Sequence, residues 1–249
     1  MAEPPIESTG ETDLERDDET RDPMFAPEVV EPAVSLLAEL ASAGPALEFG
    51  IGTGRIALPL AARGVDVHGI DLSEAAVARL RSKPRGDRVP VTIGDFSARA
   101  VESAPPGSFA LVYLVFNTIM NVTTQAGQVA VFRNAAAHLR PDGVFLIETM
   151  IPDLQRLPVG ERFVPFDVSP DHLGVDEYDL VAQGLVSHHW TRRGDEWESS
   201  SGPFRFVWPA ELDLMAELAG LRLRHRWASF GRDPLTAESR SHVSVWEKA

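Results

Sequence analysis

Hydrophobic residues between positions 45 and 150 follow two patterns that alternate along the chain. Short, largely apolar runs predict buried strands at 45–51, 65–71, 89–95, 109–116 and 143–150. Segments with apolar residues at helical spacing predict helices at 55–64, 73–83 and 124–140, after an earlier helix at 27–43. Because apolar strands that alternate with helices are typical of a parallel sheet covered on both faces, the pattern predicts an α/β fold.

The pattern changes after residue 150. Residues 177–208 alternate between apolar and polar side chains around the turn signal Arg193-Gly194-Asp195, which predicts antiparallel strands. The segment 154–174 is expected to be a loop that covers a pocket. A helix is predicted at 209–221, with Pro209 in its first turn, followed by strands at 222–230 and 241–248. We therefore expect an insertion or cap at 152–208, before the last helix.

The N-terminal segment differs from the rest in charge. Residues 1–22 hold nine acidic and two basic side chains, and so carry half of the net charge of −14. Acidic segments with few large apolar side chains cannot bury enough surface to offset the entropy of ordering. We predict a disordered acidic tail at 1–23 and one folded domain at 24–249, with its core at 45–150.

The composition excludes several classes of partner. A chain with 37 acidic and 23 basic residues is a poor general binder of nucleic acid or anionic membranes. No apolar run approaches the roughly 20 residues of a membrane helix, and the acidic N-terminus does not resemble a secretory signal. We therefore expect a cytoplasmic protein with no nucleic-acid and no membrane partner.

The chain contains no cysteine. This excludes disulfides, thiolate metal sites and any mechanism with a cysteine nucleophile. No HxH, HExxH or dense cluster of carboxylates and histidines occurs, so no metal site is predicted.

The strongest local signal is a glycine-rich loop between the first predicted strand and the next helix. It reads Glu48-Phe49-Gly50-Ile51-Gly52-Thr53-Gly54-Arg55. Glycines allow sharp turns and a close approach of the backbone to a ligand, and the following helix directs unpaired N–H groups at an anionic group. Asp71 ends the second predicted strand, where a carboxylate can accept hydrogen bonds from both hydroxyls of a ribose.

The glycine spacing separates two kinds of cofactor. A dinucleotide fingerprint is GxGxxG, whereas this loop is GxGxG and has Arg55 where the last dinucleotide glycine would stand. LEFGIGTGR and VHGIDLS resemble the first two motifs of class I S-adenosylmethionine-dependent methyltransferases. VTIGDF, FALVYLVFNTIMN and HLRPDGVFLIE resemble the motifs that follow, so the resemblance covers about residues 45–150.

The resemblance implies a fold, a cofactor and a set of binding residues. The fold would be Rossmann-like and doubly wound, with a mostly parallel seven-stranded sheet, an antiparallel last strand and the antiparallel insertion before the last helix. The cofactor would be S-adenosyl-L-methionine. It would be bound by residues of the glycine loop and of the next three strand ends, namely Glu48, Gly50, Gly52, Gly54, Asp71, Leu72, Asp95, Phe96 and Phe116.

A sheet of this kind binds ligands beyond the carboxyl ends of its strands, so the acceptor is expected there. The candidates for substrate binding are Phe25, Asn117, Met150 and His172. The candidates for catalysis are His188, His189 and Glu148, with a base needed only if the acceptor arrives protonated. Neighbouring His188 and His189 would point to opposite faces of a strand.

The leading hypothesis is a methyltransferase that moves a methyl group to a small-molecule acceptor by in-line displacement. Alternatives are a nucleotide-dependent oxidoreductase, a methyltransferase of protein or RNA, and a cofactor-binding protein without catalytic activity. The lack of cysteine excludes a cytosine-C5 DNA methyltransferase, and no proline follows Phe116-Asn117, as base-amino DNA enzymes would require. The acceptor atom, whether oxygen, nitrogen or carbon, is left open. A homodimer through the 177–208 strands is one expected assembly.

Overall fold

The computed structural model describes residues 23–249 of the chain, so the acidic tail predicted at 1–23 lies outside the described residues except for Pro23. Its larger sheet has seven strands in the spatial order β10-β11-β5-β4-β1-β2-β3. The strands are β1 (Ala46–Phe49), β2 (Val67–Asp71), β3 (Val91–Ile93), β4 (Phe109–Leu114), β5 (Leu139–Met150), β10 (Leu221–Trp227) and β11 (Ser241–Lys248). Strands β1 to β5 pair in parallel, and β11 runs antiparallel to both of its neighbours. The predicted Rossmann-like fold is confirmed.

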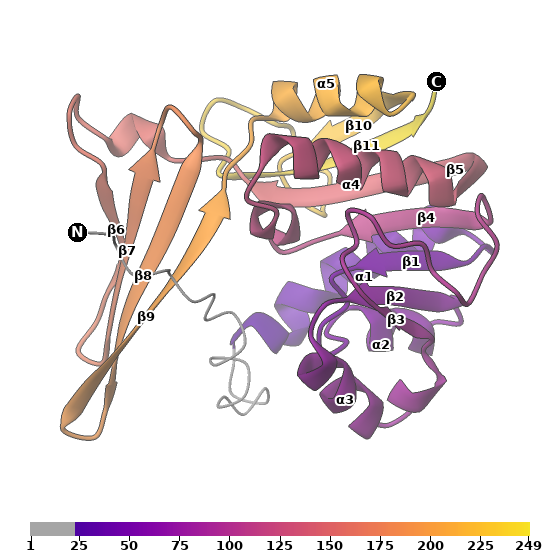
Figure 1. The fold of residues 1–249 in the computed structure, drawn as a ribbon, viewed down its shortest axis with the longest axis horizontal. Coiled ribbons are helices and arrows are strands. Elements are labelled where there is room, and N and C mark those ends of the chain that lie inside the picture. Colours follow the sequence, from indigo (N-terminus) through magenta and orange to yellow (C-terminus); the bar gives the residue numbers. More distant parts are fainter. Residues whose placement is uncertain (1–22) are drawn as a thin grey trace.

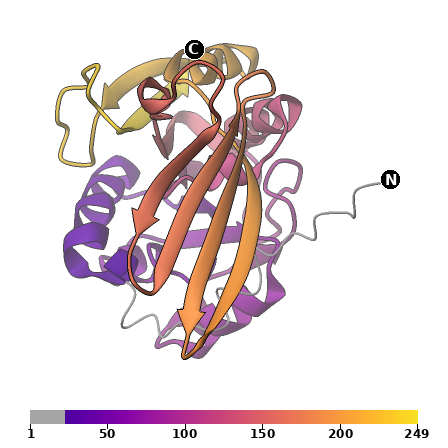
Figure 2. The same cartoon turned by 90° about the vertical axis from the view of Figure 1, so that its left-hand side faces the viewer.

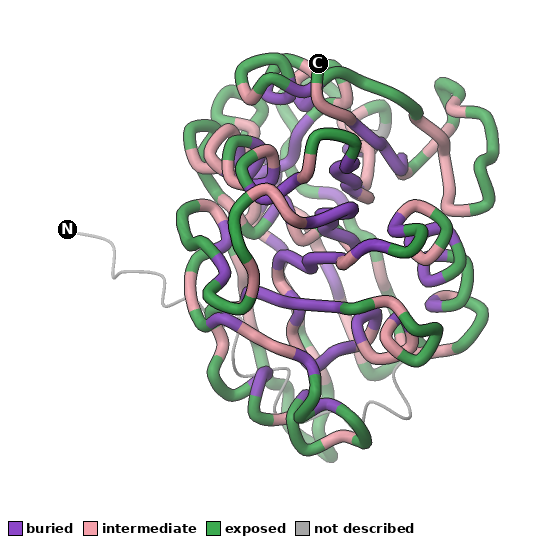
Figure 3. The backbone as a smooth tube through the Cα atoms, turned by 90° about the vertical axis from the view of Figure 1, so that its right-hand side faces the viewer, coloured by how far each residue is buried: buried purple, intermediate pink, exposed green. Residues whose placement is uncertain are grey.

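The α-helices of the described chain cover both faces of this sheet (Figure 1). They are α1 (Pro27–Ala41), α2 (Ala57–Ala62), α3 (Glu74–Ser82), α4 (Gln125–His138) and α5 (Pro209–Leu218). Two apolar clusters fill the two interfaces, one with α1, α2 and Leu80 of α3, the other with α4 and α5. Figure 3 shows the resulting layers, with buried strands between more exposed outer segments.

Local chemistry explains where several helices begin. The Ser73 hydroxyl accepts a hydrogen bond from the N–H of Ala76, and the Thr124 hydroxyl accepts one from Gly127, both at 3.1 Å. Pro209 occupies the first turn of α5, where its missing N–H removes no helical hydrogen bond. The predicted helix starts near residues 73 and 209 are therefore confirmed.

A second sheet is formed by four antiparallel strands in the order β6-β7-β8-β9. These are β6 (Phe163–Val168), β7 (His172–Asp179), β8 (Gly184–Arg193) and β9 (Glu196–Arg205). A turn with Gly194 at φ 65° joins β8 to β9, as predicted. Figures 1 and 2 show this sheet beside the end of the larger sheet at which strand β5 finishes.

Two boundaries were predicted wrongly. Residues 154–174 are not a loop throughout, because a 3₁₀ turn (Leu154–Arg156) and strand β6 lie within them and β7 begins at His172. Strand β6 is mostly exposed and has a bulge between Pro165 and Asp167, so apolar and polar residues do not alternate regularly along it. Its pairing with β7 holds it in place. Strand β5 begins at Leu139 rather than at 143, since Leu139 already pairs with Phe109 of β4.

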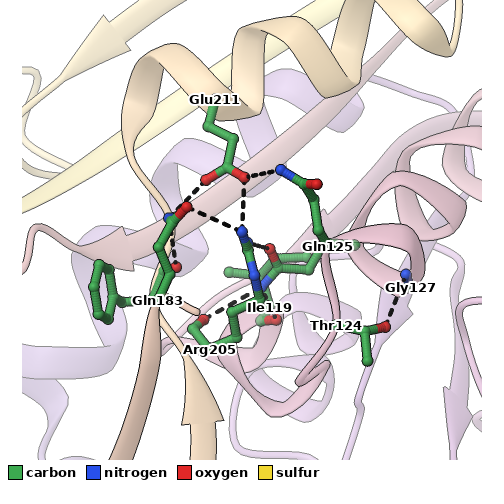
Figure 4. A network of polar contacts seen from close by, with 9 residues as sticks. Ile119, Thr124, Gln125, Gly127, Gln183, Arg205 and Glu211 are labelled. Carbon is green, nitrogen blue, oxygen red and sulfur yellow. Dashed lines mark hydrogen bonds and ion pairs between the residues drawn. The ribbon is translucent and has the colours of Figure 1, made fainter. Parts of the chain in front are cut away.

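The joint between the two sheets is polar and buried. Arg205, at the end of β9, is only 5% exposed. Its guanidinium donates to Gln128 of α4 at 2.5 Å. It also donates to Gln183 at 3.1 Å and to Glu211 of α5 at 2.8 Å, as Figure 4 shows. Gln183 and Gln125 also donate to Glu211, and these contacts together lower the pKa of its carboxyl against the effect of burial.

No helix within residues 23–249 is long and apolar enough to cross a membrane.

Replacing Arg205 with methionine tests this joint. We expect Arg205→Met to lower the free energy of unfolding by about 3 kcal/mol, because it leaves Glu211 and Gln128 without their charged partner in a buried site. Urea denaturation followed by circular dichroism measures the change. Arg222→Met, which removes an ion pair with Glu247 from a side chain 67% exposed, is the control. We expect that control to cost less than about 1 kcal/mol; equal losses in the two variants would contradict the assigned role of Arg205.

Candidate functional site

The glycine loop after β1 has a backbone that only glycine adopts easily. Gly50, Gly52 and Gly54 have φ of 74°, 53° and 84°, in the left-handed region. A Cβ on Gly50 would lie 2.6 Å from the Thr118 methyl carbon, so that glycine is required by space as well. At Gly52 nothing lies within 4 Å of the same position, which leaves the loop open on that side.

Asp71, at the end of β2, holds the loop in place. One carboxylate oxygen accepts from the N–H of Gly52 at 2.6 Å, and the other accepts from the N–H of Ser73 at 2.9 Å. Each oxygen keeps a further lone pair for a ligand. Leu72 beside it is 66% exposed, so it offers an apolar surface next to the loop.

Glu48 lies beneath the loop and is 5% exposed. Its carboxyl accepts from the Tyr113 hydroxyl at 3.0 Å and from the N–H of Ala57 at the start of α2. Burial raises the pKa of Glu48 to about 8, against the opposing effects of Tyr113 and Arg55. The group therefore holds its proton at neutral pH while no further cation is beside it.

A cavity of about 180 Å³ opens over this loop. Its walls come from η2 (Pro23–Phe25), the glycine loop and the segment after β4, and include Phe25, Glu48, Arg55 and Phe116. The Arg55 guanidinium lies 3.8 Å from the Phe116 ring centroid and 5.5 Å from that of Phe25. The cation therefore bridges two aromatic walls of the cavity.

The segment after β4 is strained and is held by Glu148 of β5. Phe116 and Asn117 both have left-handed φ, at 55° and 63°. Glu148 accepts the Phe116 N–H at 2.5 Å and also the Asn117 N–H, and burial raises its pKa. The Asn117 side-chain oxygen in turn accepts the N–H of Met150 at 2.6 Å. Glu148 thus positions the wall that carries Phe116.

Asp95 and Phe96 follow β3 at the far side of the glycine loop. Asp95 accepts the N–H of Ser97 at 2.7 Å. Phe96 is 8% exposed and stacks on Phe49 with centroids 5.7 Å apart, so its ring is part of the core. A Cβ built on Gly50 would lie 3.7 Å from the edge of the Phe96 ring, so this ring lies directly behind the glycine loop.

The three histidines of the second sheet are divided between its faces. His188 contacts Ser201 and Glu177, at 2.8 Å and 3.3 Å. His189 and His172 share the other face, where the ring nitrogens are 3.0 Å apart. The opposite orientation of His188 and His189 is as predicted.

Two residues of the site were missed from the sequence. Tyr113 stands opposite Glu48 in the β1–β4 pairing, a register that the sequence does not reveal. For Arg55 the motif comparison uses only the lack of a glycine at that position, whereas a cation directly after a glycine loop is the signal that identifies it.

Comparisons with known proteins agree with this geometry. Residues 46–143 match the family described as a methyltransferase domain. The fold is similar to that of the CcbJ methyltransferase from Streptomyces caelestis, at 35% identity, a TM-score of 0.79 and coverage of 90% of both chains. The chain belongs to the class I S-adenosylmethionine-dependent methyltransferases.

More distant relatives of this methyltransferase extend the picture. The cypemycin N-terminal methyltransferase of a Streptomyces species is 26% identical over 228 residues, which cover 88% of this chain and 91% of the relative. An S-adenosylmethionine-dependent methyltransferase from Clostridium acetobutylicum shares the fold, at 13% identity and a TM-score of 0.70 over 96% of this chain and 95% of that one. The enzyme's cofactor is S-adenosylmethionine.

The residues around the cavity fit this cofactor. The open side of Gly52 gives room for the methionine part, and buried Glu48 offers a carboxylate to its amino group. The free lone pairs of Asp71 suit the ribose hydroxyls. These roles, with those of Leu72 and Asp95 beside the adenine, remain predictions.

Asp71→Ala is expected to weaken the binding of S-adenosylmethionine by about 1–3 kcal/mol, because it removes the ribose acceptor and the support of Gly52. Isothermal titration calorimetry measures the dissociation constant. Asp66→Ala, just before the same strand and 72% exposed, is the matched control. Equal affinity in the Asp71 variant and the control would show that Asp71 does not serve the cofactor.

Glu48 should make the stability of the enzyme depend on pH. Its folded pKa of about 8 lies above the ordinary 4.5, so its contribution to stability is full below pH 4.5 and is lost as pH rises through 8. Between these limits we expect the group to lower the free energy of unfolding by roughly 1.4 kcal/mol per pH unit. Glu48→Gln does not titrate, so its stability relative to the wild type should rise from pH 5 to pH 9. Urea denaturation at pH 5, 7 and 9 measures the two stabilities. A difference in the free energy of unfolding between variant and wild type that is the same at all three pH values would contradict this assignment.

Proposed function

We propose that this enzyme transfers a methyl group from S-adenosylmethionine to a small-molecule acceptor by direct in-line displacement. The observation that carries the proposal is the position of the cavity. It lies at the carboxyl ends of β1 and β4, bounded by Glu48, Arg55 and Phe116. The four-stranded sheet stands across from this edge, where an acceptor would enter (Figure 2).

The chain's own residues have two tasks in this proposal. The glycine loop, Asp71 and Glu48 bind and orient the donor, whose sulfonium supplies an electrophilic methyl group. Glu148 and Asn117 fix the strained segment that carries Phe116, so that the acceptor meets a rigid wall. Catalysis then comes from holding donor and acceptor in line and excluding water.

The name of the cypemycin relative supports a second candidate, the amino terminus of a peptide. That relative covers nearly the whole of this chain, the four-stranded sheet included. A small amine and a peptide terminus would present the same reacting atom.

Calorimetry of the full chain with S-adenosylmethionine, its demethylated product and NADH tests the first half of the proposal. We expect both sulfur compounds to bind, with dissociation constants in the micromolar range that is ordinary for cofactors and substrates, roughly 1–100 μM. Binding of NADH alone would overturn the assignment.

A screen with methyl-labelled S-adenosylmethionine tests the second half. The acceptor panel contains small amines, alcohols, phenols and carboxylic acids, together with short peptides and bulk RNA as separate arms. Label on a small molecule supports the proposal. Label only on the short peptides would replace it with the second candidate, and label only on RNA would overturn both.

A further inference from the structure

Five side chains on one face of the four-stranded sheet form an unbroken chain of polar contacts, which we call the inner-face array. His172 Nδ1 lies 2.6 Å from Asp167 Oδ2, and His172 Nε2 lies 3.0 Å from His189 Nδ1. His189 Nε2 lies 3.2 Å from the Ser187 hydroxyl, which also bonds the carboxyl of Asp176. The array therefore has four contacts in series and a carboxylate at each end.

The array lies on the face turned toward the methyltransferase core. In the pairing of β7 with β8, Asp176 is opposite Ser187 and Gly174 is opposite His189, in step with Tyr178 opposite Leu185. Tyr178 and Leu185 belong to the apolar cluster that also holds Ile119 and Met120 of η4 (Thr118–Asn121), the turn after β4. The array thus continues along the strands from the point where the sheet meets the active-site edge (Figure 1).

The inner-face array has fewer hydrogens than its contacts require. Each of the four contacts needs one hydrogen, and an ionised carboxylate supplies none. Two neutral imidazoles and one hydroxyl supply three hydrogens, whichever tautomers the rings adopt. With both carboxylates ionised, the array therefore lacks one hydrogen, and it is completed by one added proton that belongs to the whole chain of groups rather than to one residue.

An aromatic ring shields the array on one side. Gly174 has no side chain, and a Cβ there would lie 2.3 Å from the Phe166 ring, so the glycine makes room for it. The Phe166 ring meets that of His189 edge-on at 5.3 Å, while 47% of the residue stays exposed. An exposed aromatic face beside two carboxylates suits a cationic nitrogen. Within residues 23–249 no group of three histidine or acidic residues is arranged to hold a metal ion, which leaves protons and organic cations as the ligands to consider.

Other charged groups surround the array. On the same face β9 adds Glu198, opposite Thr191, and Glu196, opposite Arg193, and β7 adds Tyr178. On the outer face His188 interacts electrostatically with Asp176, whose pKa is raised by burial, and also contacts Glu177, which pairs with Arg162. On the inner face these acidic groups outnumber Arg193, so the field on that face favours a bound cation.

We propose that the inner-face array accepts the proton of a cationic amine acceptor, so that the enzyme is an N-methyltransferase with a built-in base; this rests on the proposed function. The ammonium gives one N–H proton to the array, which completes its fourth contact. The freed lone pair on nitrogen forms the new N–C bond while the C–S bond breaks and its electron pair stays on sulfur. The positive charge that leaves the sulfonium ends on the methylated nitrogen, so charges and atoms balance.

Histidine ring NMR on the ¹⁵N-labelled full chain tests the array without an acceptor. We expect the rings of His172 and His189 to respond together at one shared midpoint as pH is lowered, because the hydrogen count gives them a single common proton. Asp167→Asn and Asp176→Asn should each move that midpoint down by about one pH unit, a tenfold loss of proton affinity, since each removes a carboxylate that favours the proton. His189→Gln should abolish the shared response.

Asp171→Asn is the matched control, because Asp171 is an exposed acid next to His172 that makes no contact with the array through its side chain in the described chain. Separate midpoints for the two rings, or equal shifts in Asp167→Asn and Asp171→Asn, would overturn the proposal. Calorimetry with S-adenosylmethionine on each variant separates the two ideas. If the cofactor binds and the shared proton is missing, the array proposal fails while the methyltransferase function stands. If label in the acceptor screen reaches only alcohols, phenols or carboxylic acids, the amine class is wrong.

Discussion

The arrangement of the two sheets depends on one buried guanidinium. Arg205 lies where the last strand of the smaller sheet ends, and its contacts reach α4, α5 and the residue before β8. A buried cation is tolerated only when its donors are occupied, so the three partners must all be in place at once. The angle between the sheets is therefore set by hydrogen-bond geometry, which is directional, as well as by apolar contact, which is not.

A second arginine, Arg55, interacts with carboxyl groups on two sides of the cavity. Two carboxyls with raised pKa, Glu48 and Glu148, lie near this one cation, and each also accepts backbone N–H groups. Glu48 supports the helix after the glycine loop, while Glu148 supports the strained segment after β4. The two walls of the cavity are thus held by carboxyls whose pKa values are both lowered by the same cation.

The sequence predicted most of the parallel sheet because its strands are buried on both faces and because several of its helices have a capping residue or a proline at the start. Ser73 and Pro209 marked helix starts correctly. Strand β6 was not predicted because exposed edge strands have little hydrophobic pattern. It forms by pairing with β7, and that pairing cannot be read from the sequence of β6 alone. The same limit applies to the site. The glycine loop is local in sequence and was found, whereas the contact of Tyr113 with Glu48 depends on strand register, and the joining of Asp167 to Asp176 through two histidines depends on a bulge and two hairpins.

The smaller sheet begins and ends at neighbouring places in the fold. The chain leaves the larger sheet after Met150 in β5 and returns at Pro209 in α5, which packs on α4 beside that strand. The segment between Met150 and Pro209 is therefore connected to the rest of the fold at two neighbouring places. The glycine loop precedes both of these places in the sequence. Changes in this stretch of the gene can therefore accumulate, or the stretch can be exchanged as a block, while the codons for the donor loop stay untouched. Under the proposed function, a lineage of such enzymes can change its acceptor while the residues that hold the methyl donor stay the same.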